Sequence, residues 1–350
     1  MKKLDAPSRN KLIRVLMTWL VTVVMVFVFT ADIAVNLYGN RLVNAIPVPD
    51  EHSDHETSDD RIHFLNTANS DCIVLESNGH YALVDTGEGN ENPRRKTAYR
   101  GYRDDVLGYL KTLNRREDGK VHFDFMLVTH YHYDHDGNCE AVINDDELVI
   151  EKAYMKPYNE QVSTDVETDA WGNLDVYNAI IAALQKKNVP FYSDLPDGDF
   201  AFGDFTLRFF NTVTPPAIYN RGANSDSVGV RVTKGTETAF LAADFTAESG
   251  LEETYGDDIG EVTLLKIGHH GYYGSSSRSF LKKLKPQIAI VTNHLGKIYP
   301  NVKWNLTVVA HAATFSTANR DGIIAAFTDD GRILLTQRIM PMINQMKSFR

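Results

Sequence analysis

The chain has 350 residues, enough for one large domain or two ordinary ones. With 43% hydrophobic and 23% charged residues, it has the composition of a folded protein rather than of a disordered one. The formal net charge of −10 argues against a basic surface that coats nucleic acid, although a bound cation would reverse the field locally.

An apolar segment follows a basic amino terminus. Residues 1–14 carry Lys and Arg, and the chain is then uncharged from Val15 to Ala31. This pattern predicts a transmembrane helix over residues 15–37, with residues 1–14 in the cytoplasm and the rest of the chain outside the cell membrane. A core helix would be expected to have a polar face, which this segment lacks. Phe29 stands where a signal-peptide cleavage site takes a small residue, so a single-pass anchor is favoured over a cleaved signal and a secreted protein.

Two segments follow the apolar stretch. Residues 38–61 are interpreted as an acidic linker, because the part from residue 49 onward is rich in Asp and Glu and nearly free of apolar residues. Residues 62–350 contain no Pro-, Gly- or Ser-rich linker, and we expect them to form one domain.

The domain alternates strand and helix patterns. Strands are expected in RIHFLN, DCIVLES and YALVDTG, with a tight turn at SNGH between the last two. Apolar residues at helical spacing predict a helix over residues 174–188, closed by Asn188 and Pro190. The second half again mixes strands with helices and ends in a hairpin around DDG. This arrangement predicts an α/β layered sandwich.

The stretch THYHYDHDG, residues 129–137, directly follows the apolar strand FMLV. His130 and His132 are two residues apart in an extended turn, so their rings can point the same way. Asp134 and His135 follow where the chain bends. Four potential ligands in six residues exceed what one tetrahedral zinc ion normally takes from a short segment, so the pattern favours two metal ions.

Together with other segments, this motif resembles the metallo-β-lactamase-fold hydrolases. Within them the chain is most similar to the soluble domain of the ComEC-like competence proteins and to related secreted phosphodiesterases. The segments that carry the resemblance are, in chain order, FLNTANSDCIVLE, LVDTG, HYHYDH, FLAADF and LKIGHHG. They lie between about residues 62 and 300, and their order and spacing are more specific than any one of them. The resemblance implies a metallo-β-lactamase-type αββα four-layer sandwich behind the transmembrane helix.

The resemblance also implies roles for individual residues. His130 and His132 would hold one metal ion, and Asp134 and His135 the other. Asp244 would bridge the two ions. The remaining implied roles are these: His269, or its neighbour His270, completes the second ion's ligands; Asp134 and His270 serve catalysis; Asp85 supports the site from behind the ligands.

The chain departs from the family pattern at the first ion. Many members supply a further His there, but residues 136–240 contain none. In the place of the Asn-Ser pair of ComEC-like members stand Asp226 and Ser227, and Asp226 either ligates the first ion or caps a strand. The resulting oxygen-rich site favours manganese over a purely zinc preference, so the two divalent ions are expected to be zinc or manganese.

Other departures concern the substrate. Tyr299 replaces the family's substrate-contacting His before Pro300, and nearby His294 either compensates for it or only ends a strand. Tyr272 and Tyr273 either stack on a base or pack the rim of the site.

The resemblance implies a hydrolase that uses a metal-bound hydroxide. The expected substrates are phosphodiesters of the nucleic-acid, nucleotide or phosphorylcholine type, so DNA or a wall polymer is an expected partner. The alternatives are hydrolysis of a carbonyl substrate such as a β-lactam, lactone or thioester, and a non-catalytic metal-binding accessory. The sequence does not indicate an oligomeric state.

Overall fold

The structure is a computed structural model that describes residues 6–45, 58–94, 100–213, 221–318 and 322–336. Three of the segments discussed above lie partly outside these residues: the start of the basic segment (1–5), half of the acidic linker (46–57) and the end of the expected domain (337–350).

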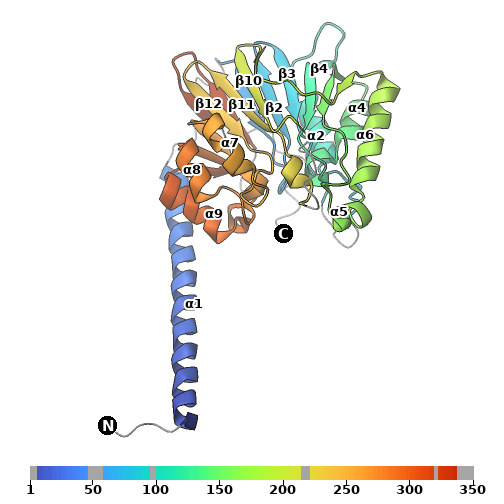
Figure 1. Cartoon of the computed structure of the whole chain (residues 1–350). Coiled ribbons are helices and arrows are strands. Elements are labelled where there is room, and N and C mark those ends of the chain that lie inside the picture. Colours follow the sequence, from blue (N-terminus) through green and yellow to red (C-terminus); the bar gives the residue numbers. More distant parts are fainter. Residues whose placement is uncertain (1–5, 46–57, 95–99, 214–220, 319–321, 337–350) are drawn as a thin grey trace.

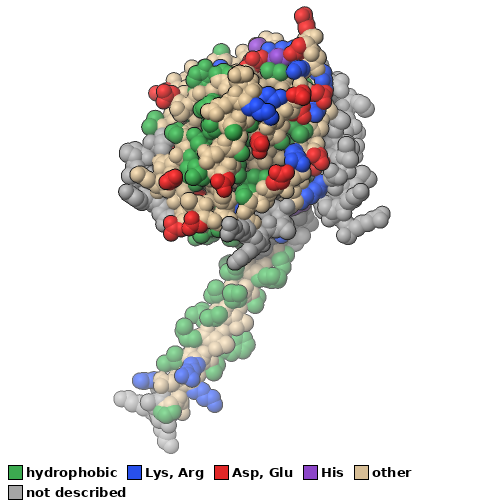
Figure 2. All heavy atoms as spheres, turned by 90° about the vertical axis from the view of Figure 1, so that its right-hand side faces the viewer, with side chains coloured by type: hydrophobic (Ala, Val, Ile, Leu, Met, Phe, Trp, Pro, Cys, Tyr) green, Lys and Arg blue, Asp and Glu red, His purple; other side chains and the backbone are tan. Residues whose placement is uncertain are grey.

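A single long helix, α1 (Ala6–Ala45), projects from the domain (Figure 1). Its segment Pro7–Ala31 is long and apolar enough to cross a membrane, and none of its most apolar 18-residue window is buried. Hydrophobic side chains run along this helix, with basic side chains near its N-terminal end (Figure 2). The helix extends beyond residues 15–37 on both sides. On the amino-terminal side, the Arg and Lys residues of the basic segment are good helix formers. It is compatible with a membrane-associated protein.

Two mixed sheets form the centre of the domain within the described residues. The first has eight strands, in the order β17 (Ile333–Thr336), β16 (Ile323–Phe327), β1 (Arg61–Phe64), β2 (Ile73–Ser77), β3 (His80–Val84), β5 (Phe125–Val128), β7 (Ala153–Met155) and β8 (Phe191–Tyr192). The second has seven, in the order β15 (Ala313–Ser316), β14 (Ile288–Val291), β13 (Leu264–Lys266), β12 (Glu237–Leu241), β11 (Gly229–Lys234), β10 (Phe205–Phe210) and β9 (Asp199–Phe202). A small separate pair joins β4 (Val121–Phe123) and β6 (Leu148–Ile150).

Strand periodicity divides the core into three layers of side chains. In β5, Phe125 and Leu127 point between the two sheets, whereas Met126 and Val128 point to the outer face of the first sheet. Helices cover both outer faces. The first sheet is covered by α2 (Arg103–Leu110), α4 (Cys139–Asn144) and α6 (Asn173–Lys187), and the second by α7 (Leu251–Ile259), α8 (Arg278–Leu284), α9 (Pro300–Trp304) and η5 (Asn305–Ala310). The predicted αββα four-layer sandwich is therefore confirmed.

Local signals in the sequence match the observed elements. The helix expected over residues 174–188 is α6, which ends where Asn188 takes a left-handed conformation and its N–H bonds to carbonyl groups of the last turn. The SNGH turn joins β2 to β3, and the DDG hairpin joins β16 to β17.

The topology brings polar strand ends from both sheets to one edge. Strands β3 and β5 run parallel in the first sheet, and β12, β13 and β14 run parallel in the second. Parallel strands end on the same side of a sheet, so the residues that follow these five strands converge there. This edge contains the site.

A buried ion pair connects the sheets beside that edge. Lys266, at the end of β13, donates from its Nζ to Asp71, which precedes β2. Both side chains are almost fully buried, and Thr292 donates to the other Asp71 oxygen at 2.6 Å. Burial would raise the pKa of Asp71, but the Lys266 ammonium and the neighbouring His270 hold it well below its ordinary value.

Removing one partner of this pair would leave a buried charge alone. We expect Lys266→Met to lower the free energy of unfolding by about 3–5 kcal/mol, as is typical of a broken buried ion pair. The double variant Lys266→Met/Asp71→Asn should lose less, because no charge is left unpaired. Urea unfolding of the full chain in detergent, with a chelator present, measures both values. Equal losses in the single and double variants would contradict this account.

Candidate metal centre

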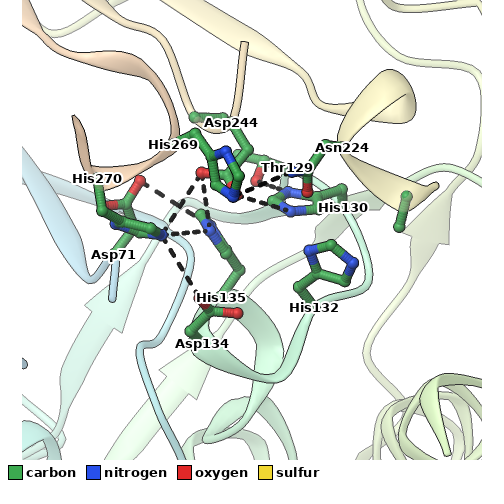
Figure 3. Close-up of polar contacts among 12 residues, drawn as sticks. Asp71, Thr129, His130, His132, Asp134, His135, Asn224, Asp244, His269 and His270 are labelled. Atoms are coloured by element: carbon green, nitrogen blue, oxygen red, sulfur yellow. Dashed lines mark hydrogen bonds and ion pairs between the residues drawn. The ribbon is translucent and has the colours of Figure 1, made fainter. Parts of the chain in front are cut away.

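The site is assembled from the ends of strands in both sheets (Figure 3). The first sheet contributes the residues after β5, which continue into the short helix α3 (Tyr133–Asp136). The second contributes Asp244 after β12 and the turn η3 (Gly268–Gly271) after β13. The ligand-type side chains that meet here are His130, His132, Asp134, His135, Asp244, His269 and His270.

Asp244 lies at the centre of this group. Its carboxylate is fully buried, and neither oxygen accepts a hydrogen bond from any residue that the structure describes. One oxygen, Oδ1, lies 3.2 Å from His135 Nε2 and 3.5 Å from His270 Nε2. The other, Oδ2, lies 3.6 Å from His130 Nε2. The two oxygens therefore face two different sets of histidines.

The first set consists of His130, His132 and Asp244, whose ligand-type atoms lie within 4.8 Å of one another. The second set contains His135, His270 and Asp244, with the two Nε2 atoms 3.1 Å apart. Asp134 adjoins it, because its Oδ2 lies 3.6 Å from His270 Nε2. Asp71 also falls within this spacing, but its oxygens already accept from Lys266 and Thr292.

The spacing and the missing hydrogen bonds fit divalent metal ions. Ligands about 2.0–2.1 Å from a tetrahedral ion lie about 3.3 Å from one another, close to the separations measured around Asp244. His130 Nε2 and both Asp244 oxygens are buried without a hydrogen-bond partner among the described residues. Polar atoms left this way are costly unless a ligand satisfies them. The residues present therefore fit two ions that share the Asp244 carboxylate.

Hydrogen bonds behind the site fix which nitrogen each ring presents. The Thr129 hydroxyl donates its proton to Asp85 at 2.7 Å. Because this proton is used, the hydroxyl oxygen must accept a hydrogen bond from His130 Nδ1, which lies 3.1 Å away. His130 therefore carries its proton on Nδ1 and presents the lone pair of Nε2. Burial and the neighbouring His135 lower the pKa of His130 to about 3, so its ring is neutral.

The same arrangement recurs behind His270. Thr292 donates to Asp71, so its hydroxyl accepts from His270 Nδ1 at 3.0 Å. At His135, Nδ1 bonds directly to Asp85 at 2.7 Å. Burial alone would lower the pKa of His135, but the Asp244 and Asp85 carboxylates raise it well above its ordinary value. The field at this position thus favours positive charge.

The two adjacent histidines of HHG occupy different places. His270 is fully buried within the second set. His269 lies nearer the first set, with Nε2 3.8 Å from Asp244 Oδ2, and accepts from Asn224 Nδ2 at 3.2 Å. Both residues have positive φ, 45° and 50°, a conformation that non-glycine residues rarely adopt. Alternation along a strand therefore could not predict which ring joins the second set.

Four other residues singled out in the sequence lie around the site rather than among its ligands. Asp226 accepts from Lys156 Nζ at 2.9 Å, and Ser227 is buried next to it. Tyr299 is exposed at the rim, with its ring 6.0 Å from Tyr272. His294 is half-buried, and its backbone N–H donates to Asn293.

Sequence reasoning missed several residues that contact the ligands. Arg94 donates to Asp134 Oδ1 at 2.6 Å, Glu167 bonds to His132 at 2.6 Å, and Asn224 bonds to His269. Burial would raise the pKa of Glu167, but His132 and backbone N–H groups lower it to about 2. Only Asn224 could have been found from the sequence, because it lies two residues before Asp226, in the segment NSDS (residues 224–227). The structure places it in the 3-10 turn η2 (Ala223–Asp226).

Comparison with known families agrees with this geometry. The sequence profile of the family described as "Metallo-beta-lactamase superfamily" matches residues 65–292, more than half of the chain. The chain belongs to the metallo-beta-lactamase superfamily. Members of this superfamily usually bind divalent metals, and the two histidine sets of this chain agree with that property.

Two curated proteins are similar to parts of the chain. Recombination protein 2 of Haemophilus influenzae is 30% identical over 84 residues, which cover 24% of this chain and 10% of that protein. ComE operon protein 3 of Bacillus subtilis is 24% identical over 178 residues, covering 50% of this chain and 20% of that protein. The chain thus spans a fifth or less of these relatives. With the family match, they support the predicted ComEC-like branch.

Among solved structures, the chain is similar to the metallo-beta-lactamase fold protein YhfI from Bacillus subtilis. The two are 15% identical, with a TM-score of 0.45, over 76% of this chain and 98% of that one.

The position of Asp244 generates a prediction about metal content. We expect two ions per chain in elemental analysis of the purified protein after addition of zinc or manganese. Asp244→Ala should reduce occupancy at both positions, because one carboxylate faces both sets. The matched control is Asp226→Asn, a buried aspartate that pairs with Lys156. Loss of a single ion in Asp244→Ala, or of an ion in Asp226→Asn, would contradict the bridging assignment.

Proposed function

We propose that this chain is a metal-dependent phosphodiesterase held at the cell membrane by α1. Two divalent ions, zinc or manganese, bind at the edge where the two sheets meet. The observation that carries the proposal is the Asp244 carboxylate, buried between two histidine sets with no hydrogen bond from a described residue to either oxygen.

The ligand assignment follows the two sets. His130, His132 and Asp244 hold the first ion, with His269 at its edge. The second ion is held by Asp134, His135, Asp244 and His270. Asp134 and His270 act in catalysis by holding this ion, and Asp85 keeps the His135 ring in place. Asp226, which accepts from Lys156, and the buried Ser227 beside it support the wall of the site.

Two divalent cations at these positions would stabilise the negative charge on both the attacking and the leaving oxygen of a displacement at phosphorus. The chain's own residues keep the histidines in the required state. Thr129, Asp85 and Thr292 retain the Nδ1 protons of three rings, so that their Nε2 lone pairs face inward. Burial of these ligands excludes competing water.

Charge at the site supports an anionic substrate. Arg94 lies beside Asp134, stacked over the ring of Trp171 at 5.0 Å, and a guanidinium group suits a phosphate oxygen. Cations at the site would offset the repulsion from a chain of net charge −10. The names of the relatives, a recombination protein and a competence-operon protein, support DNA over a wall polymer. Tyr299, exposed beside Tyr272, and the half-buried His294 are assigned to substrate binding.

The proposed topology rests on α1 and the charges before it. Arg9, Lys11 and Arg14 precede the apolar segment, which favours a cytoplasmic amino terminus and a catalytic domain outside the cell. A secreted enzyme would result if the segment were removed as a signal peptide.

The central test is hydrolysis of an activated bis-aryl phosphodiester by the full chain in detergent, supplied with zinc or manganese. We expect His132→Ala and Asp134→Ala each to lower the initial rate by at least about 100-fold, because each removes an ion ligand. Both variants should remain folded, since these side chains contact the ions rather than the hydrophobic core. The measurement is initial rate, with circular dichroism to verify folding.

The matched control is His80→Ala, an exposed histidine at the β2–β3 turn that pairs with Asp124. Its rate should equal that of the unmodified chain. The substrate panel includes a β-lactam, a lactone and a thioester. Turnover of one of these without phosphodiester cleavage would refute the reaction, and full activity of either ligand variant would refute the site.

A further inference from the structure

His132 differs from the other histidines of the site in the nitrogen that is already bonded. In His130, His135 and His270, Nδ1 is held from behind and Nε2 faces inward. In His132, Nε2 lies 2.6 Å from Glu167 Oε1, and both side chains are buried. An ionised carboxylate can only accept, so the ring carries its proton on Nε2. Nδ1 is then the nitrogen that can bind an ion.

Glu167 belongs to a different part of the chain, the short helix α5 (Asp165–Asp169) between β7 and α6. Its carboxylate is held at several points. Oε2 accepts from the backbone N–H of Thr164 at 2.6 Å, as part of a capping box. Oε1 accepts from the backbone N–H of Ala223 at 2.9 Å, in addition to His132. The carboxylate thus joins the histidine motif, α5 and η2.

The surroundings leave His132 little freedom to turn. The ring of Trp171 packs edge-on against it at 5.3 Å between centroids. Gly222, with φ of 83°, brings the backbone close to Glu167, and a Cβ there would lie 3.2 Å from Oε1. The Ala223 bond also fixes the turn η2, which carries Asn224 to His269. One carboxylate therefore bonds both to His132 and to the turn that reaches His269.

We propose that Glu167 is the positioning residue of His132, which holds the ring so that Nδ1 binds the ion shared with His130 and Asp244. A carboxylate that accepts from the far nitrogen of a ligating histidine fixes its tautomer and orientation. The inference rests on the proposed function, because it assigns Glu167 to the first ion of that site. The carboxylate that holds the His132 ring belongs to a residue 35 positions after it in the chain.

The test measures metal affinity rather than activity. Zinc binding to the full chain in detergent is followed by competition with a chromogenic chelator. We expect Glu167→Gln to bind one of the two ions about 10–100-fold more weakly and the other within about two-fold of the unmodified chain. Glu167→Asp keeps the charge but not the reach, and should show the same selective loss if the Gln variant does not fold.

Two controls separate positioning from a structural role. Asp169→Asn, an exposed acid on the same helix, should leave both affinities unchanged. Thr164→Val removes the hydrogen bond from the Glu167 N–H to the Thr164 side chain. This variant should lower thermal stability without lowering the affinity for either ion. In a His132→Ala background, Glu167→Gln should change affinity by less than about two-fold, since the ring it positions is absent.

A measurement on the unmodified chain needs no variant to fold. Nitrogen NMR of the zinc-loaded, ¹⁵N-histidine-labelled protein should show His132 protonated at Nε2 and metal-bound at Nδ1. The reverse pattern, or two ions bound as tightly in Glu167→Gln as in the unmodified chain, would overturn this inference alone. An unmodified chain that binds no ion would instead overturn the proposed function.

Discussion

The buried carboxylate of Asp244 is the constraint on which the rest of the site depends. It comes from the second sheet, but two of the nearest histidines, His130 and His135, follow a strand of the first. Neither oxygen accepts a hydrogen bond from the described residues, so the arrangement is stable only if positive charge lies on both sides of the carboxylate. The two sheets must therefore be held in fixed register at this edge. The buried ion pair between Lys266 and Asp71 does so from behind the site.

The site also depends on a repeated arrangement of hydrogen bonds. In two places an aspartate accepts from a threonine hydroxyl, which in turn accepts from a histidine Nδ1: Asp85–Thr129–His130 and Asp71–Thr292–His270. Each threonine lies just beyond the end of a strand, so the strand itself sets its position. Each chain of bonds fixes the tautomer of its histidine. Structural and functional demands thus meet in the same residues, because Asp71 both pairs with Lys266 and orients His270.

The fold and family could be predicted because their signals are local. Strand and helix periodicity, the tight turns and the order of the motifs predicted the four-layer sandwich and the superfamily, and both are confirmed. Residues of the HxHxDH motif, His130 to His135, lie beside Asp244 because both segments follow strands that end at the same edge of the two sheets. The extent of α1 was harder to predict, because residues 6–14 before the expected span and residues 38–45 after it continue the helix.

The remaining features depend on contacts that the sequence does not encode locally. Which histidine of the HHG pair joins the second set follows from two consecutive positive φ angles. In η2, a 3-10 turn sends Asn224 toward His269 and Asp226 toward Lys156, a difference that depends on backbone geometry rather than residue type. Glu167 and Arg94 reach the site from segments at least 35 residues away from their partners, so no spacing rule could identify them.

The most direct test of the central claim is anomalous X-ray diffraction from crystals of the full chain grown with zinc, recorded on both sides of the zinc absorption edge. The account predicts two anomalous peaks, one at each oxygen of Asp244. One should be ligated by Nε2 of His135 and His270, and the other by Nε2 of His130 and Nδ1 of His132. A single peak, or peaks that leave either Asp244 oxygen without a cation, would contradict it.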